Sequence, residues 1–221
     1  MIDSLIKSKR IFIFDFDGVL VDSVEIKTKA FAYLYESYGT DVVKNVIKFH
    51  RENGGMSRYE KFRYFHNNFL QMDISKDEIN RLSKNFSKFA VDAVVKANCI
   101  SGSEDFLKKL LKKQLPTFVV SATPQKEIKE IIKRRNWAKY FNDIFGSPNT
   151  KSENINIILK NNSEITLKDC IFFGDALSDL DAAESHKIDF IGIQNDILDV
   201  FKDKVDSDFL IRDFSHLNKN F

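Results

Sequence analysis

The chain has 221 residues, of which 43% are hydrophobic and 30% are charged, and its formal net charge is +2. This length suits one domain with a large insertion, or two small domains. The near-neutral charge excludes a strong general attraction to nucleic acid or to a membrane surface, so neither is expected as a partner. Cys99 and Cys170 stand far apart, which argues against a disulfide framework and favours a reducing compartment. No apolar stretch approaches the roughly 18 residues needed to cross a bilayer, and we expect a cytoplasmic protein.

The first expected element is a strand over residues 11–14, where the run IFIF is uniformly apolar. Asp15 and Asp17 follow it on either side of Phe16, in the segment FDFDGVL. Neighbouring carboxylates repel each other and are costly to remove from water. The pair therefore belongs either to a solvated turn or to a site with a cation between the acids. Gly18 permits a tight turn and a close backbone approach at this point.

The next segment, residues 22–96, contains almost no strand-like run. Its apolar side chains recur at intervals of three and four residues, which predicts amphipathic helices packed on one another. We expect helices over residues 27–38, 42–50, 58–70 and 76–94. The chain then divides into a core, residues 1–21 and 97–221, and an all-helical insert, residues 22–96, which we call the cap.

Beyond the cap, strand-like runs alternate with helical patterns, as in βαβ units. Strands are expected over residues 117–120, 144–145, 171–173 and 190–193, with helices over residues 104–115, 125–135, 154–160 and 179–186. The predicted fold class is α/β: a Rossmann-like, doubly wound parallel sheet covered by helices on both faces, with an inserted helical cap domain. Ligands of such sheets bind beyond the carboxyl ends of the strands.

The fourth expected strand also ends in acids, in the segment GDALSD. Asp179 follows Asp175 by one helical turn and can point the same way. Together with Asp15 and Asp17, these carboxylates would converge on one crevice, which is strongly unfavourable without a cation. Oxygen ligands with room for water suit a hard ion, and Mg²⁺ fits best.

Two further segments offer groups for an anion. Ser121 follows the second expected strand, where Thr123 is expected to cap a helix that begins at Pro124. Free N–H groups at that helix start, with the serine hydroxyl, would favour an anion. Lys151 follows the short third strand, where it would offset carboxylate charge and hold a phosphate oxygen. Alternatively, Ser121 is an ordinary loop residue, Thr123 only caps a helix, and Lys151 is an exposed surface lysine.

In this order, DFDGVL, the serine, the lysine and GDALSD resemble the four motifs of the haloacid dehalogenase (HAD) superfamily, over residues 11 to about 193. The insert after the first motif resembles the subgroup with a small helical cap, as in phosphoglycolate phosphatases and β-phosphoglucomutases. The resemblance implies that Asp15 is a nucleophile that forms an aspartyl-phosphate, and that Asp17 serves as acid and then as base. It also implies Mg²⁺ ligands and phosphoryl-binding groups: Asp15, the backbone carbonyl of Asp17, Asp175 and the nearby Asp179 for the metal, and Ser121, the Ala122 N–H and Lys151 for the phosphoryl group.

The cap segment NGGMSR resembles a specificity loop that related caps lower into the active site. Gly55 would provide a bend and Arg58 a charge for the leaving group, although an ordinary helix–helix turn is the alternative. The acid at Asp17 favours phosphate-ester chemistry, because dehalogenases of this superfamily lack an acid there and its transport ATPases carry threonine.

We therefore expect a Mg²⁺-dependent phosphatase that acts on a small phosphorylated metabolite: a sugar, polyol or short-acid phosphate. One alternative is a phosphomutase of the β-phosphoglucomutase type. An alternative of another class is a catalytically inactive module that binds phosphate or metal. The motifs describe only the phosphate end of the substrate, and they do not indicate an oligomeric state.

Overall fold

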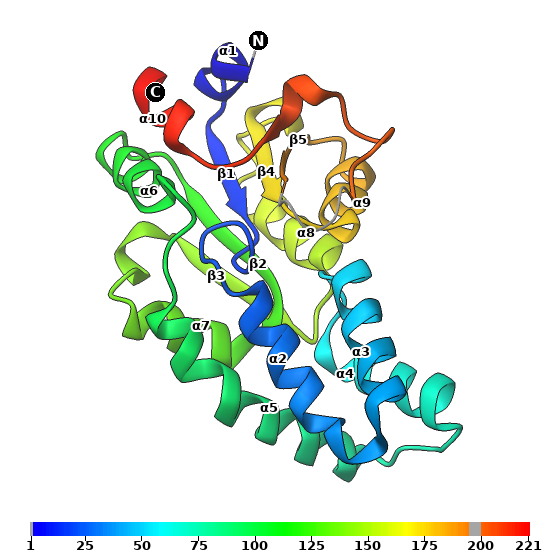
Figure 1. The fold of residues 1–221 in the computed structure, drawn as a ribbon. Coiled ribbons are helices and arrows are strands. Elements are labelled where there is room, and N and C mark those ends of the chain that lie inside the picture. Colours follow the sequence, from blue (N-terminus) through cyan, green and yellow to red (C-terminus); the bar gives the residue numbers. More distant parts are fainter. Residues whose placement is uncertain (1, 195–199) are drawn as a thin grey trace.

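The protein is described here from a computed structural model, which describes residues 2–194 and 200–221. Its centre is a six-stranded parallel sheet with the strand order β3-β2-β1-β4-β5-β6 (Figure 1). The strands are β1 (Ile11–Phe14), β2 (Thr117–Pro124), β3 (Asp143–Ser147), β4 (Cys170–Gly174), β5 (Asp189–Ile193) and β6 (Leu210–Ile211). This is the predicted Rossmann-like α/β arrangement. It brings the carboxyl ends of β1, β2 and β4 side by side, because β1 pairs with both of the others.

Helices cover both faces of the sheet, as its buried strands require. The α-helices of the core are α1 (Ile2–Lys7), α6 (Ser103–Lys112), α7 (Gln125–Arg134), α8 (Lys151–Asn161), α9 (Leu177–Ser185) and α10 (Ser215–Asn220). Short 3-10 turns lie at Glu36–Tyr38, Ala138–Tyr140, Leu167–Asp169 and Ser207–Phe209.

The side chains of β1 alternate between two apolar clusters, as the strand period demands. Phe12 and Phe14 pack with α6 and α7 on one face, whereas Ile11 and Ile13 pack with α8 and α9 on the other. Phe14 stacks on Phe173 of β4, with ring centroids 4.8 Å apart. β1 is thus buried on both sides and holds the residues at its carboxyl end in fixed positions.

The cap consists of helices that extend from the carboxyl edge of the sheet (Figure 1): α2 (Val24–Leu34), α3 (Thr40–Glu52), α4 (Arg58–Tyr64) and α5 (Lys76–Lys96), with a π-helical turn at Phe65–Leu70. It has an apolar cluster of its own, centred on Phe31. The ring of Phe31 lies 4.5 Å from that of Phe86 and 5.7 Å from that of Phe62, between centroids. This separate cluster supports the division at residues 22 and 96, which stays a prediction.

The structure corrects several expected boundaries. β2 continues to Pro124, so Thr123 is a strand residue, and Pro124 rather than Thr123 occupies the position that precedes α7. The helix expected over residues 58–70 changes from α to π geometry at Phe65. Helices α1 and α10 have six residues each and β6 has two, lengths too short to give a periodic signal. Among the described residues, none of the helices combines the length and apolarity needed to span a bilayer.

Candidate active site

Asp15 lies directly after β1 and is 5% exposed. Its backbone N–H donates to the Phe173 carbonyl at 2.9 Å, which ties it to β4. One carboxylate oxygen accepts the backbone N–H of Phe16 at 2.5 Å, and the other accepts a hydrogen bond from Lys151 Nζ at 2.6 Å. Phe16 points away into the core, where it packs against Trp137. The carboxylate is therefore fixed in orientation, as attack on a bound group requires.

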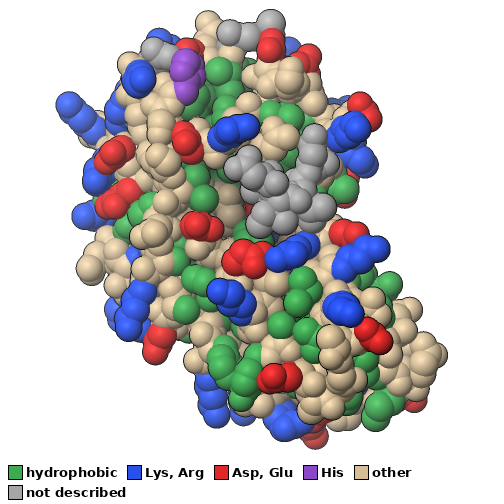
Figure 2. All heavy atoms as spheres, in the orientation of Figure 1, with side chains coloured by type: hydrophobic (Ala, Val, Ile, Leu, Met, Phe, Trp, Pro, Cys, Tyr) green, Lys and Arg blue, Asp and Glu red, His purple; other side chains and the backbone are tan. Residues whose placement is uncertain are grey.

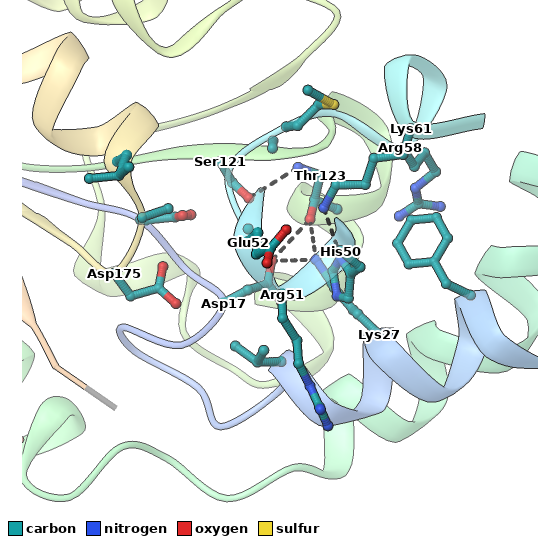
Figure 3. Close-up of a pocket in the computed structure, with 18 of the residues that line it drawn as sticks. Asp17, Lys27, His50, Arg51, Glu52, Arg58, Lys61, Ser121, Thr123 and Asp175 are labelled. Atoms are coloured by element: carbon teal, nitrogen blue, oxygen red, sulfur yellow. Dashed lines mark hydrogen bonds and ion pairs between the residues drawn. The ribbon is translucent and has the colours of Figure 1, made fainter. Parts of the chain in front are cut away.

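Asp17 is held by side chains from the cap and from β2 (Figure 3). Ser23 Oγ donates to it at 2.6 Å, Thr123 Oγ1 donates at 3.1 Å, and Lys27 forms an ion pair with it. Burial opposes ionisation of Asp17, but the Lys27 charge and these hydrogen bonds outweigh it and lower the pKa. The network therefore favours the carboxylate form of Asp17, which is the form that accepts a proton.

Lys27 is a site residue that the sequence does not reveal. It lies on α2, where a lysine on an amphipathic helix ordinarily indicates a solvated face. Its ammonium pairs with Asp17 and donates to Thr123 at 2.7 Å, so it joins the cap to β1 and β2. Thr123, which the sequence predicts to cap a helix, instead forms hydrogen bonds with Lys27 and Asp17 in this network.

We expect Lys27→Met to lower kcat by about 10- to 100-fold with little change in KM, because Asp17 loses the group that orients it. Steady-state rates of phosphate release from an ester that the parent enzyme hydrolyses measure both kcat and KM. Lys29→Met, an exposed lysine on the same helix, is the matched control. A kcat equal to that of the control would show that Lys27 does not position Asp17.

Three carboxylates meet beyond β1 and β4. Oxygens of Asp15, Asp175 and Asp179 all lie within 4.8 Å of one another. Gly18 makes this approach possible: it has φ of +79°, and a Cβ there would lie 2.1 Å from Asp175 Oδ2. The predicted convergence of these acids at one edge of the sheet is therefore present in the structure.

The donor set fits a hard cation. Burial, followed by repulsion from Asp15 and Asp179, raises the pKa of Asp175 well above its usual value. Burial also raises the pKa of Asp179 to about 7, although Lys151 opposes this shift. Such a cluster is stable in its ionised form only next to positive charge, and Lys151 contacts Asp15 and Asp179 but not Asp175. Within the described residues Asp175 forms no ion pair, and an all-oxygen site of this kind suits Mg²⁺. The side chain of Asp17 lies outside this group, which is compatible with the implied role of its backbone carbonyl.

Lys151 is the first residue of α8, and the capping box of Thr150 and Glu153 fixes that helix start. Burial opposes the charge of Lys151, but Asp15 and Asp179 outweigh it and raise the pKa. Ser121 is buried near the carboxyl end of β2, and its Oγ accepts the Thr123 N–H at 3.1 Å. Ser121 and Ala122 line the same cavity as Asp15. Two of the residues expected to hold a phosphoryl group thus line the cavity with Asp15, and the third, Lys151, contacts Asp15 directly.

The cap loop lies directly over this site. A Cβ at Gly55 would fall 1.7 Å from Ser178 Oγ and 3.3 Å from Lys151 Nζ, so the loop backbone touches the core there. Arg58 lines the cavity but is committed to another partner: it pairs with Glu127 of α7 and stacks over Phe86, 4.3 Å from the ring centroid. Its predicted contact with substrate stays a prediction.

A cavity of about 80 Å³ lies between the cap and the core (Figure 3). Asp15 and Asp17 line it at the core, and Lys61 and His50 line it within the cap. Lys61, like Glu127, carries no sequence signal, because a lysine in a short helix is ordinarily exposed. Acidic and basic side chains lie next to each other on the outer surface where cap and core meet (Figure 2).

Comparison with protein families gives one match to most of the chain: the model of haloacid dehalogenase-like hydrolases matches residues 12–193. Among curated proteins, a phosphorylated carbohydrates phosphatase of Thermotoga maritima is 26% identical over 183 residues, covering 81% of this chain and 82% of the relative.

Solved structures share the fold at low identity. The β-phosphoglucomutase of Clostridium difficile has a TM-score of 0.73 and 18% identity, and the match covers 96% of each chain. An HAD hydrolase, YfnB, of Bacillus subtilis bound to magnesium has a TM-score of 0.71 and 17% identity, with 96% of this chain and 97% of the other covered. These likenesses extend through both the sheet and the cap.

Proposed function

Because this chain belongs to the family of haloacid dehalogenase-like hydrolases, we propose that it is a Mg²⁺-dependent phosphatase acting through an aspartyl-phosphate. The observation that carries the proposal is the setting of Asp15. Its buried carboxylate is oriented by the Phe16 N–H and Lys151, it faces a cavity lined by Ser121 and Ala122, and two further carboxylates lie beside it. An ionised aspartate so placed is a nucleophile that needs no base to activate it.

In the first half-reaction, a carboxylate oxygen of Asp15 attacks the phosphorus of the ester. The bond between phosphorus and the leaving oxygen breaks, and Asp17, which enters this step in its less populated protonated form, gives its proton to that oxygen. The proton that Asp17 later takes from water restores this form for the next turnover. Ser121, the Ala122 N–H and Lys151 hold the phosphoryl oxygens as their charge redistributes. The products are the free alcohol and an acyl phosphate on Asp15.

In the second half-reaction, Asp17, now a carboxylate, removes a proton from water. The water oxygen attacks phosphorus, the bond to Asp15 breaks, and inorganic phosphate leaves. The Lys27 pair and the hydrogen bonds from Ser23 and Thr123 favour this basic form of Asp17.

Asp15, the carbonyl of Asp17, Asp175 and Asp179 would hold Mg²⁺ beside the reacting group. When bound, the ion neutralises the carboxylates and the phosphoryl oxygens, so that anionic nucleophile and anionic substrate can approach. The YfnB structure, which has the same fold and is bound to magnesium, supports this assignment.

The substrate is proposed to be a small phosphorylated sugar, polyol or short acid. The Thermotoga maritima relative is named for phosphorylated carbohydrates, which supports this class. The cavity of about 80 Å³ supports a compact leaving group.

The test is inorganic phosphate release from a panel of sugar, polyol and short-acid phosphates, with Mg²⁺ and after its removal with EDTA. We expect release that depends on Mg²⁺ and returns when Mg²⁺ is restored. Isomerised sugar phosphate without phosphate release would indicate a phosphomutase instead. Absence of both products, with Mg²⁺ binding retained, would indicate an inactive binding module.

The contact of Gly55 with Ser178 makes a separate prediction about cap closure. Gly55→Ala is expected to lower kcat/KM by about 10- to 100-fold, because the new methyl group overlaps Ser178 and keeps the loop off the site. In the described residues Ser178 Oγ has no hydrogen-bond partner, so Ser178→Gly removes the clash without breaking a bond. The pair Gly55→Ala/Ser178→Gly should recover most of the activity relative to Ser178→Gly alone. Equal losses with and without Ser178 would contradict the contact as the cause.

A further inference from the structure

The cavity above Asp15 continues into the cap, where its lining changes. Phe31 and Phe86 contribute aromatic walls, and Lys61 and His50 contribute the polar atoms. At about 10–15 Å³ for each water, its 80 Å³ admits a group of several heavy atoms. This end of the cavity is the place for the leaving part of a substrate whose phosphoryl group sits at Asp15.

Lys61 is the feature of this cavity that the proposed chemistry does not use. The residue is 1% exposed. Its Nζ lies 2.7 Å from His50 Nδ1 and 5.5 Å from the centroid of the Phe31 ring. Within the described residues it forms no ion pair with a carboxylate. The side chain extends from α4 into the cavity (Figure 3).

The other cations that line the cavity are all neutralised. Lys27 pairs with Asp17, Arg51 with Glu25, and Arg58 with Glu127. His50 offers Lys61 a lone pair rather than a charge, because burial, and then the nearby Lys61, lower the His50 pKa well below its usual value. Lys61 is thus the cavity cation that lacks a counter-charge in the described chain.

A buried ammonium without an ion-pair partner destabilises a fold. Burial, followed by repulsion from Lys27 and Lys151, lowers the pKa of Lys61 well below its usual value and outweighs the attraction of the more distant Asp175 and Asp17. The surroundings would accept an apolar side chain at lower cost, since the ring of Phe31 is next to Lys61. An anion in the cavity would supply the missing charge at short range, in a site shielded from water, where ion pairs are strong.

We propose that Lys61, oriented by His50, binds an anionic group on the leaving part of the substrate: a carboxylate or a second phosphoryl group. This inference rests on the proposed function, because the phosphoryl group at Asp15 fixes where the remainder of the substrate lies. Arg58 does not fill this role in the structure, since Glu127 already occupies its guanidinium. A neutral hydroxyl would leave the charge of Lys61 uncompensated.

The test compares esters in which an anionic group replaces a neutral hydroxymethyl or hydroxyl group: phosphoglycerate against glycerol phosphate, and propanediol bisphosphate against propanediol monophosphate. The first pair tests recognition of a carboxylate, and the other pair tests recognition of an additional phosphoryl group. We expect kcat/KM to favour the anionic member of at least one pair by about 30-fold or more. Lys61→Met should abolish that preference by lowering kcat/KM for the anionic member by about 30-fold or more. Lys88→Met, an exposed lysine of the cap, should keep the preference.

Binding gives a readout that does not depend on turnover. In an Asp15→Asn background with Mg²⁺, phosphoglycerate should raise the melting temperature more than glycerol phosphate does, and Lys61→Met should remove the difference. Lys61→Met removes a buried charge and also one hydrogen bond to His50, so the melting temperature of each variant without ligand is measured as the reference, and loss of folding does not mimic the result. Equal preference, or equal binding, in the parent and in Lys61→Met overturns the role of Lys61.

Phosphate release without charge preference overturns this inference alone. Absence of release from every ester overturns the proposed phosphatase, while the binding arm still decides the role of Lys61.

Discussion

Glu127→Ala is expected to lower the free energy of unfolding by about 3–5 kcal/mol, because it leaves the Arg58 guanidinium buried without its counter-charge. The side chains of the pair are only 4% and 11% exposed. Glu127 accepts hydrogen bonds from both Arg58 and Ser87, so it joins α4 and α5 of the cap to α7 of the core. Urea unfolding followed by circular dichroism measures the change.

Glu130→Ala, on the exposed side of the same helix, is the matched control and should change stability by less than about 0.5 kcal/mol. The double variant Arg58→Met/Glu127→Leu should recover most of the loss, because well-packed apolar groups replace a buried pair at little cost. If Glu127→Ala unfolds at the same urea concentration as the control, the pair is not a stabilising contact between cap and core.

Asp15→Asn is expected to lower kcat at least about 10⁴-fold, because the amide oxygen is a poor nucleophile and forms no acyl phosphate. Phosphate release under saturating substrate and Mg²⁺ measures the effect. Asp22→Asn, an exposed aspartate close in sequence, should retain full activity. A rise in the melting temperature of Asp15→Asn on addition of substrate would show that the variant still binds it. This measurement separates loss of chemistry from loss of the binding site. Turnover above about one hundredth of the parent value would rule out Asp15 as the nucleophile.

The parts of the fold that the sequence predicts are those with long or uniform patterns. The IFIF run predicts β1 with the bounds that the structure shows. A strand buried on both faces is apolar at every position, so its ends are marked by the first polar residues on either side. The acids after β1 and β4 could be placed together because parallel strands present their carboxyl ends at one edge. Asp15, Asp175 and Asp179 meet there.

The contacts between cap and core are not predictable in the same way. Lys27, Lys61 and Glu127 lie on helices, and in the sequence each has the same local pattern as a charged residue that faces solvent. The pattern alone therefore predicts exposure for all three. Their burial arises only when α2 and α4 pack around the cavity and α7 packs against α5, which is a property of the tertiary arrangement. Thr123 shows a related effect: its cap-like sequence context is overridden because β2 continues alongside β3.

Phosphoryl transfer is proposed to pass through Asp15, and trapping the covalent intermediate tests this most directly. The enzyme with Mg²⁺ is mixed with an ester labelled in its phosphoryl group, quenched in acid within one turnover, digested and examined by mass spectrometry. We predict one phosphoryl group on the peptide that contains Asp15, absent in Asp15→Asn and lost on treatment with hydroxylamine. Release of phosphate with no labelled peptide, or with the label on another residue, would contradict the role of Asp15 as nucleophile.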